Sequence, residues 1–165
     1  MPTKTAARAA PVRHWLMKSE ADCFSFDDLL AAPDRTTFWD GVRNYQARNF
    51  MREMRPGDLV LFYHSSSEPA GVAGIAEVVR PAYPDHTAFD EAHEHYDPKS
   101  RADSPLWDMV DVRAVEKLPS FVSLDVLRRE PAVGEMLVLR RGNRLSVTPV
   151  TPEEFDAVRR LGRTA

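Results

Sequence analysis

Two apolar segments that flank a short polar loop constrain the fold more than any other feature of this chain. Residues 58–64 read DLVLFYH and residues 71–79 read GVAGIAEVV, with the loop SSSEPAG joining them. A nearly continuous apolar strand is typical of a strand covered on both faces, so the first segment is expected in the middle of a sheet. Ser, Pro and Gly in the joining loop are typical of turns. The sequence therefore predicts a central antiparallel hairpin.

Further strands and helices are predicted on either side of this hairpin. The segment 106–118 alternates apolar and polar residues, which is typical of a half-buried strand, and shorter strands are expected at 14–19 and within 142–150. Helices are predicted where a residue that commonly caps a helix N-terminus precedes apolar residues at helical spacing. These caps are Ser25, Asn44, Ser123 and Thr151.

The predicted order of elements indicates an α+β fold. It runs strand, helix, helix, hairpin, a long irregular excursion over 81–106, strand, helix, strand, helix. The regular alternation of a doubly wound α/β sheet is missing. A small, strongly bent, mainly antiparallel sheet flanked by helices fits this order, and so does a barrel built from such a sheet.

The bulk properties of the 165 residues exclude several classes of protein. Length and composition fit one domain, expected over 13–165 after a frayed tail at 1–12. No window reaches the ~18 apolar residues of a membrane span. Cys23 is the only cysteine, so an internal disulfide is impossible and a cytoplasmic location is expected. A net charge of −3 argues against a protein that coats long stretches of duplex, but it permits a local basic patch.

The motifs of common catalytic and cofactor sites are missing. The sequence contains neither GxGxxG nor GxxxxGK[ST], so no nucleotide cofactor is expected. His93 and His95 would share one face of an extended segment near His86, which permits an adventitious ion, but a solvated acidic loop is favoured and no metal site is predicted. Cys23 lacks an evident histidine partner and no serine lies in a GxSxG elbow, so no catalytic residue is predicted.

Aromatic residues in polar surroundings remain as candidates for a binding site. Trp39 precedes Asp-Gly in FWDGVRNYQARNFM and lies outside the apolar stripe of the helix that follows. Its ring is interpreted either as part of the core, where tryptophan is commonly found, or as the wall of a pocket. The polar run 18–20 ends the first predicted strand. A pocket with an aromatic floor and a few polar groups is how proteins hold an unstacked base.

Four blocks of the sequence resemble one known family. They read HWLMKSEADCFSFDDL, FWDGVRNYQARNFMREMRPGDLVLFYHS, GVAGIAEVVRPAYPD and WDMVDVRAVEKL, and together they resemble an EVE domain over about residues 13–161. The EVE family is PUA-like and related to the YTH domains. The resemblance implies a pseudo-barrel with helices around it and a pocket for a modified base. The pocket positions that it implies are Lys18, Ser19, Glu20, Trp39, Asn44, Tyr45, Tyr63, His64 and Tyr96.

Particular roles follow from the resemblance and from the chemistry of the side chains. Trp39 matches the first cage tryptophan of the YTH domains, and Tyr96 is the nearest candidate for the second cage aromatic. The carboxylate of Glu20 can accept a hydrogen bond from the exocyclic amine of cytosine or adenine. Phosphate contacts, or alternatively a solvated helix face, are expected from Arg43, Arg48 and Arg52.

The function expected from these observations is a non-catalytic, monomeric module that needs no cofactor and binds DNA or RNA carrying a modified base. One alternative is an enzyme that acts on a modified nucleotide, with Glu20 or His64 as general base. Another is a protein-interaction domain whose pocket is vestigial and filled by side chains. The sequence leaves the base, its modification and the choice between DNA and RNA open.

Overall fold

A single six-stranded sheet organises the residues that the structure describes, which are 11–164 of this computed structural model. The strands are β1 (His14–Glu20), β2 (Thr36–Trp39), β3 (Leu59–Ser65), β4 (Gly71–Pro84), β5 (Asp108–Ser123) and β6 (Val147–Val150). The helices are α1 (Phe26–Ala31), α2 (Tyr45–Glu53), α3 (Leu124–Arg128) and α4 (Pro152–Arg163). Of the predicted tail, residues 1–10 lie outside the described part. Within that part, no helix is long and apolar enough to span a membrane.

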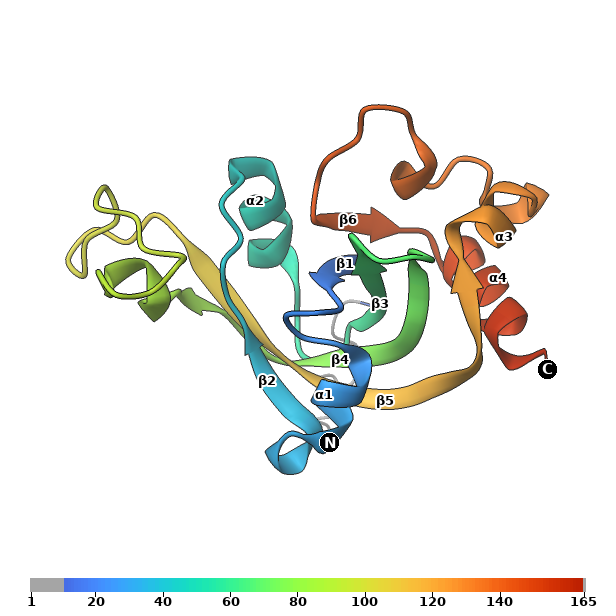
Figure 1. Ribbon diagram of the computed structural model, residues 1–165. Helices are drawn as coiled ribbons and strands as arrows, with labels where there is room; N and C mark the ends of the chain where they lie inside the picture. Colours follow the sequence, from blue (N-terminus) through green and yellow to red (C-terminus); the bar gives the residue numbers. More distant parts are fainter. Residues whose placement is uncertain (1–10, 165) are drawn as a thin grey trace, which may run out of the picture.

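The predicted hairpin forms the centre of the sheet, as the order β2-β5-β4-β3-β1-β6 requires. β3 pairs with β4 in antiparallel fashion, and β1 is the strand that lies parallel to β3. The two outermost strands, β2 and β6, leave the sheet open among the described residues, so the bent sheet is observed and not a closed barrel. β4 and β5 curve through several register shifts, which bend a sheet strongly (Figure 1).

The helix starts predicted from capping residues are confirmed. The Ser25 and Thr151 side chains each accept from the backbone N–H three residues on, and both form a complete capping box. Asn44 accepts from Ala47 N, and Ser123 from Val126 N. These predictions succeed because a cap depends on residues within one turn of each other.

Two strands differ from the sequence-based expectation. β2 was not predicted, because four residues at a sheet edge with Phe38 exposed carry little alternation. β4 continues to Pro84 although the prediction ended it at residue 79. It can do so because its pairing with β5 shifts register between Val78 and Tyr83, where prolines are tolerated at bulges.

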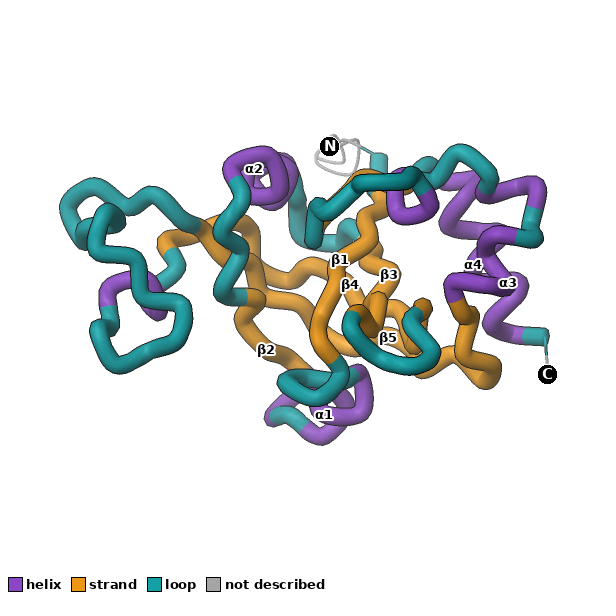
Figure 2. Tube along the Cα trace, turned by 45° about the horizontal axis from the view of Figure 1, so that its top comes forward, coloured by secondary structure: helices purple, strands orange, loops and turns teal. Residues whose placement is uncertain are grey.

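Side chains alternate across the sheet and build one hydrophobic cluster on each face. On β1, Trp15 and Met17 belong to the cluster that α2 covers, whereas Leu16 belongs to the cluster that α4 covers. Trp39, at the end of β2, is part of the α2-side cluster. Figure 2 shows the excursion between β4 and β5 at the end of the sheet opposite α3 and α4. The α2 side of the sheet and this excursion together frame the candidate site.

Candidate functional site

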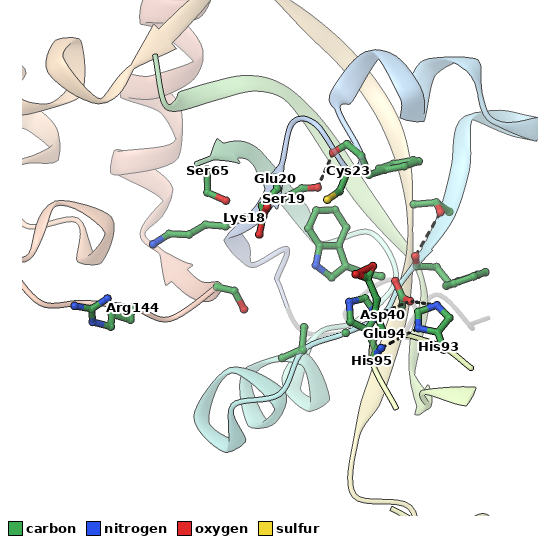
Figure 3. A pocket seen from close by; sticks show the side chains of 17 residues that line it. Lys18, Ser19, Glu20, Cys23, Asp40, Ser65, His93, Glu94, His95 and Arg144 are labelled. Carbon is green, nitrogen blue, oxygen red and sulfur yellow. Dashed lines mark hydrogen bonds and ion pairs between the residues drawn. The ribbon is translucent and has the colours of Figure 1, made fainter. Parts of the chain in front are cut away.

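A cavity of about 740 Å³ opens where the ends of β1 and β2 meet the excursion and the loop before β6. Its lining comes from residues 18–24, 37–42, 93–95 and the segment around 144–146, with Ser65 at the end of β3. Figure 3 places the labelled side chains of Asp40, His93, Glu94 and His95 together on one side, and those of Lys18 and Arg144 on another. The volume lies within the range of small-molecule sites.

Trp39 belongs both to the core and to the cavity wall. The residue is 8% exposed, and its ring meets Phe62 edge to face with centroids 5.2 Å apart. The same residue lines the cavity. The core therefore fixes the orientation of the indole, while part of it stays open to a ligand.

The turn after Trp39 is built around a glycine. Gly41 has φ +83°, and a Cβ at this position would lie 2.5 Å from Cε1 of His95. The imidazole of His95 thus packs directly on the Gly41 backbone, which only glycine allows. The turn then leads to Asn44, which caps α2. Close packing at Gly41 brings the excursion up against the residues beside Trp39.

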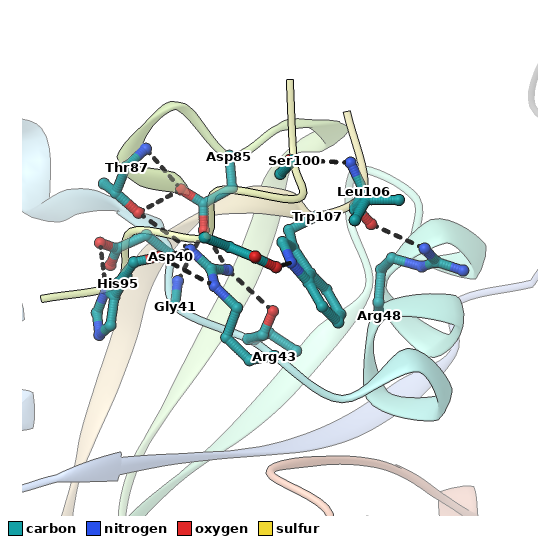
Figure 4. Close-up of polar contacts among 12 residues, drawn as sticks. Asp40, Gly41, Arg43, Arg48, Asp85, Thr87, His95, Ser100, Leu106 and Trp107 are labelled. Atoms are coloured by element: carbon teal, nitrogen blue, oxygen red, sulfur yellow. Dashed lines mark hydrogen bonds and ion pairs between the residues drawn. The ribbon is translucent and has the colours of Figure 1, made fainter. Parts of the chain in front are cut away.

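A buried carboxylate anchors the excursion to this turn. Asp85 accepts from Gly41 N at 2.8 Å, from Arg43 Nη1 at 3.0 Å and from Thr87 N at 2.9 Å (Figure 4). Burial alone would raise the pKa of Asp85, but the hydrogen bonds from Thr87, Gly41 and Arg43 outweigh it and hold the pKa below its ordinary value. Arg43 also donates to the backbone oxygen of His95 at 2.7 Å. The charged network therefore fixes one wall of the cavity.

Four of the predicted pocket residues lie together at the cavity: Lys18, Ser19, Glu20 and Trp39. The Ser19 hydroxyl donates to the Phe24 carbonyl at 2.6 Å and so holds the loop that follows β1. Glu20 is exposed, and its carboxylate makes no hydrogen bond with any residue that the structure describes. Lys18 is partly buried, and this loss of water lowers its pKa.

The other five predicted pocket residues do not line this cavity. Asn44 is occupied as the α2 cap, and Tyr45 stacks on Trp107 with ring centroids 4.7 Å apart. Tyr63 packs in the α4-side cluster, because side chains alternate along β3 and Phe62 faces the α2-side cluster. His64 lies in a separate hollow of about 300 Å³, where its Nε2 accepts from Phe26 N at 3.1 Å. Tyr96 is exposed beyond the lining residues.

The three arginines predicted at phosphates hold the protein itself together. Arg43 is bound to Asp85 and to the His95 carbonyl. Arg48 donates to the Leu106 carbonyl at 2.8 Å, and Arg52 forms an ion pair with Asp108. All three join α2 or its approach to the excursion and to the start of β5. The basic residues that do line the cavity are Lys18 and Arg144, and neither forms an ion pair with a described carboxylate.

Three residues of the cavity were not predicted from the sequence: Asp40, His93 and His95. The carboxylate of Asp40 has Oδ2 at 3.2 Å from His95 Nδ1 and at 3.8 Å from His93 Nε2. Candidate metal-ligating atoms of these three residues lie within 4.8 Å of one another. However, His93 Nδ1 accepts the His95 backbone N–H at 3.0 Å, which leaves the proton of the neutral ring on Nε2, facing Asp40. This pattern favours hydrogen bonds over a metal ion.

Fold and sequence together identify this chain as an EVE domain protein with a PUA-like fold, because residues 13–161 match the EVE domain family. Human thymocyte nuclear protein 1 is 45% identical over 177 residues, which cover 95% of this chain and 79% of that protein. A solved structure of the human THYN1 protein in complex with 5-methylcytosine-containing DNA has a TM-score of 0.87 at 44% identity, covering 93% of this chain and 99% of that one. A hypothetical protein from Leishmania major has a TM-score of 0.86 at 45% identity, covering 92% and 95%.

Proposed function

We propose that this chain binds nucleic acid and holds one unstacked, modified base in the cavity beside Trp39, without chemical turnover. The observation that carries the proposal is the similarity, at 44% identity and a TM-score of 0.87, to a human protein whose solved structure is a complex with 5-methylcytosine-containing DNA. 5-Methylcytosine is therefore the modification to test first. An open cavity of about 740 Å³ argues against a vestigial pocket filled by side chains.

Trp39 supplies the apolar wall for the base. A methyl group adds apolar surface worth about 0.8 kcal/mol when it is buried, and contact with an aromatic face brings the discrimination to about 1–2 kcal/mol. Because Phe62 already orients the indole, little side-chain freedom is lost on binding. In duplex DNA the base must first leave the stack, which costs a few kcal/mol. A base that is already unpaired should therefore bind more tightly.

Lys18 and Arg144 are the proposed phosphate contacts, in place of Arg43, Arg48 and Arg52. Both line the cavity, and neither has a carboxylate partner among the described residues. The lowered pKa of Lys18 reflects an ammonium group that has lost water on burial. A phosphate would provide the missing counter-charge, whereas the other arginines would have to break internal ion pairs or hydrogen bonds. A few such contacts suit a protein of net charge −3 that grips one or two nucleotides.

Binding without catalysis also agrees with the surroundings of His64 and Glu20, the two residues that could act as a general base. The Nε2 lone pair of His64 accepts the Phe26 backbone N–H, and His64 lies outside the cavity lining. Glu20 has no hydrogen-bonded partner in the described part of the chain that would position it for proton transfer. The enzyme alternative has no support of this kind.

Fluorescence polarisation with labelled oligonucleotides tests the proposal. The probes are single strands and duplexes that differ only in one central base, cytosine or 5-methylcytosine, measured at several salt concentrations. We expect wild type to prefer the methylated probes about 5- to 30-fold, and Trp39→Phe to reduce that preference while the protein stays folded. Equal affinity for methylated and plain probes at every salt concentration would overturn the proposal.

A further inference from the structure

We infer that Asp40, and not Glu20, reads the amine edge of the bound base and makes the cavity selective for 5-methylcytosine over thymine. The inference rests on the proposed function and adds the residue that distinguishes two pyrimidines with the same methyl group. These bases differ at position 4, where cytosine carries an amine that donates and thymine an oxygen that accepts. Asp40 directly follows Trp39 in the chain, so an acceptor lies beside the proposed aromatic wall.

A hydrogen bond from His95 orients the Asp40 carboxylate, and the His93 ring lies beside it. His93 Nδ1 accepts from His95 N, so the His93 proton lies on Nε2, which faces Asp40 Oδ2. His95 Nδ1 faces the same oxygen at 3.2 Å, and it carries a proton because a carboxylate can only accept. His95 therefore binds this oxygen atom, and the His93 ring lies next to it at 3.8 Å without a hydrogen bond (Figure 3).

The second oxygen of this carboxylate remains available to a ligand. Asp40 Oδ1 forms no hydrogen bond with any described residue, and it is not among the buried atoms that lack a partner. Asp40 lines the cavity with 23% of its side chain exposed. An acceptor of this kind is partly desolvated and already oriented, so a hydrogen bond to a base amine is stronger than at a fully hydrated carboxylate.

Glu20 lacks both advantages. It is exposed at the end of β1, and no side chain or backbone group in the described region fixes its carboxylate. Ordering a glutamate side chain on binding costs rotamer freedom, which weakens the hydrogen bond that it could make. Both acids line the same cavity, but only Asp40 is held by a hydrogen bond from a neighbouring side chain, His95.

Asp40 would distinguish 5-methylcytosine from thymine because the wrong base leaves its carboxylate without a hydrogen-bond donor. A site that accepts a hydrogen bond from an amine rejects an analogue that brings a carbonyl oxygen, because the carboxylate then faces lone pairs and has no donor to bind. An interaction of this type changes affinity about 5- to 150-fold between bases. Replacing Asp40 by asparagine keeps the shape but adds an NH₂ group that can donate to thymine O4.

The experiment compares single-stranded probes with 5-methylcytosine, cytosine or thymine at one central position. We expect wild type to prefer 5-methylcytosine over thymine at least tenfold, and Asp40→Asn to bring the two affinities within about threefold. Part of that change should be tighter thymine binding, a gain that a damaged fold cannot produce. Glu20→Gln is the matched control, because it removes the same charge from the rival carboxylate and should keep the wild-type preference.

The outcomes separate this inference from the proposed function. If wild type prefers 5-methylcytosine over cytosine but Asp40→Asn still rejects thymine as strongly as wild type, Asp40 does not read the edge and the proposed function stands. Loss of thymine rejection in Glu20→Gln alone would assign the role to Glu20. If wild type does not distinguish 5-methylcytosine from cytosine, the proposed function and the inference fail together.

Discussion

Arg43 Nη1 lies 3.0 Å from Oδ2 of Asp85, and the Asp85 side chain is completely buried. The pair joins the segment that leads into α2 to the start of the excursion, 42 positions further along the chain. The same carboxylate accepts the Gly41 backbone N–H. One buried acid therefore connects the turn that carries Trp39 and Asp40 to the loop that carries His93 and His95.

Removing this carboxylate should destabilise the fold. We expect Asp85→Ala to lower the free energy of unfolding by about 3 kcal/mol, because Arg43, Gly41 and Thr87 lose a common acceptor. Urea denaturation at pH 7 measures the change. Asp103→Ala, at an exposed acid of the same excursion, is the control and should cost less than about 0.5 kcal/mol. Similar losses in both variants would show that the Asp85 network does not stabilise the fold.

The stabilisation by Asp85 should also depend on pH. Its pKa in the folded state is below the unfolded value of 3.8, so the unfolded chain takes up a proton first as the pH falls. The stabilisation is therefore complete above about pH 5 and disappears as the pH falls through the folded pKa. Wild type should approach the stability of Asp85→Ala in strong acid, as measured by unfolding at successive pH values.

The packing of His95 on Gly41 leads to a third prediction, with Gly142 as the matched control. Both glycines have positive φ, +83° and +79°, but a Cβ at Gly142 meets nothing within 4 Å. Gly142→Ala should cost about 1 kcal/mol from backbone strain alone. Gly41→Ala should cost at least about 1 kcal/mol more, because its methyl group collides with the His95 ring. Thermal melting of both variants gives the comparison, and equal losses would contradict this packing.

Local signals in the sequence predicted the helices and the central hairpin, because caps such as Ser25 and Thr151 act within one turn. The edge strand β2 was missed because its position depends on pairing with β5, more than 70 residues away in sequence. The extension of β4 through two prolines depends on register shifts against the same partner. Neither pairing leaves a clear pattern within the segment itself.

The sequence predicted the part of the candidate site that lies at the ends of strands. Residues 18–20 and Trp39 lie at strand ends and line the cavity. Tyr63 lies on the face of β3 opposite Phe62 and so outside the cavity lining, as alternation along DLVLFYH places it. The excursion supplies His93 and His95 in place of Tyr96, because buried Asp85 sets its path, and nothing in the sequence distinguishes Asp85 from the other acids nearby.

The proposed phosphate contacts predict how DNA affinity changes with salt. Removing one side chain that binds a phosphate should reduce the slope of log affinity against log salt concentration by about one. Two variants should each show this change: Lys18→Met, which keeps the apolar stem, and Arg144→Ala. Each should weaken the binding of methylated and plain probes equally. Arg52→Ala is the control, because Arg52 already pairs with Asp108 and should leave the slope unchanged. If Arg52→Ala reduces the salt slope and the other two variants do not, Arg52 contacts a phosphate and Lys18 and Arg144 do not.

The burial of His14, which lies away from the cavity, should make the protein less stable in mild acid. Its ring packs on Phe155 with centroids 4.5 Å apart, and its buried Nδ1 has no hydrogen-bond partner among the described residues. Burial lowers the pKa of His14 in the folded state, so the unfolded chain binds the proton first and stability falls as the pH drops below about 6.5. His14→Phe should keep the stability near pH 7.5 and reduce this decline, although the lowered pKa of His64 preserves part of it. Urea denaturation between pH 7.5 and 5 measures both slopes, and an unchanged decline in His14→Phe would exclude His14 as the responsible group.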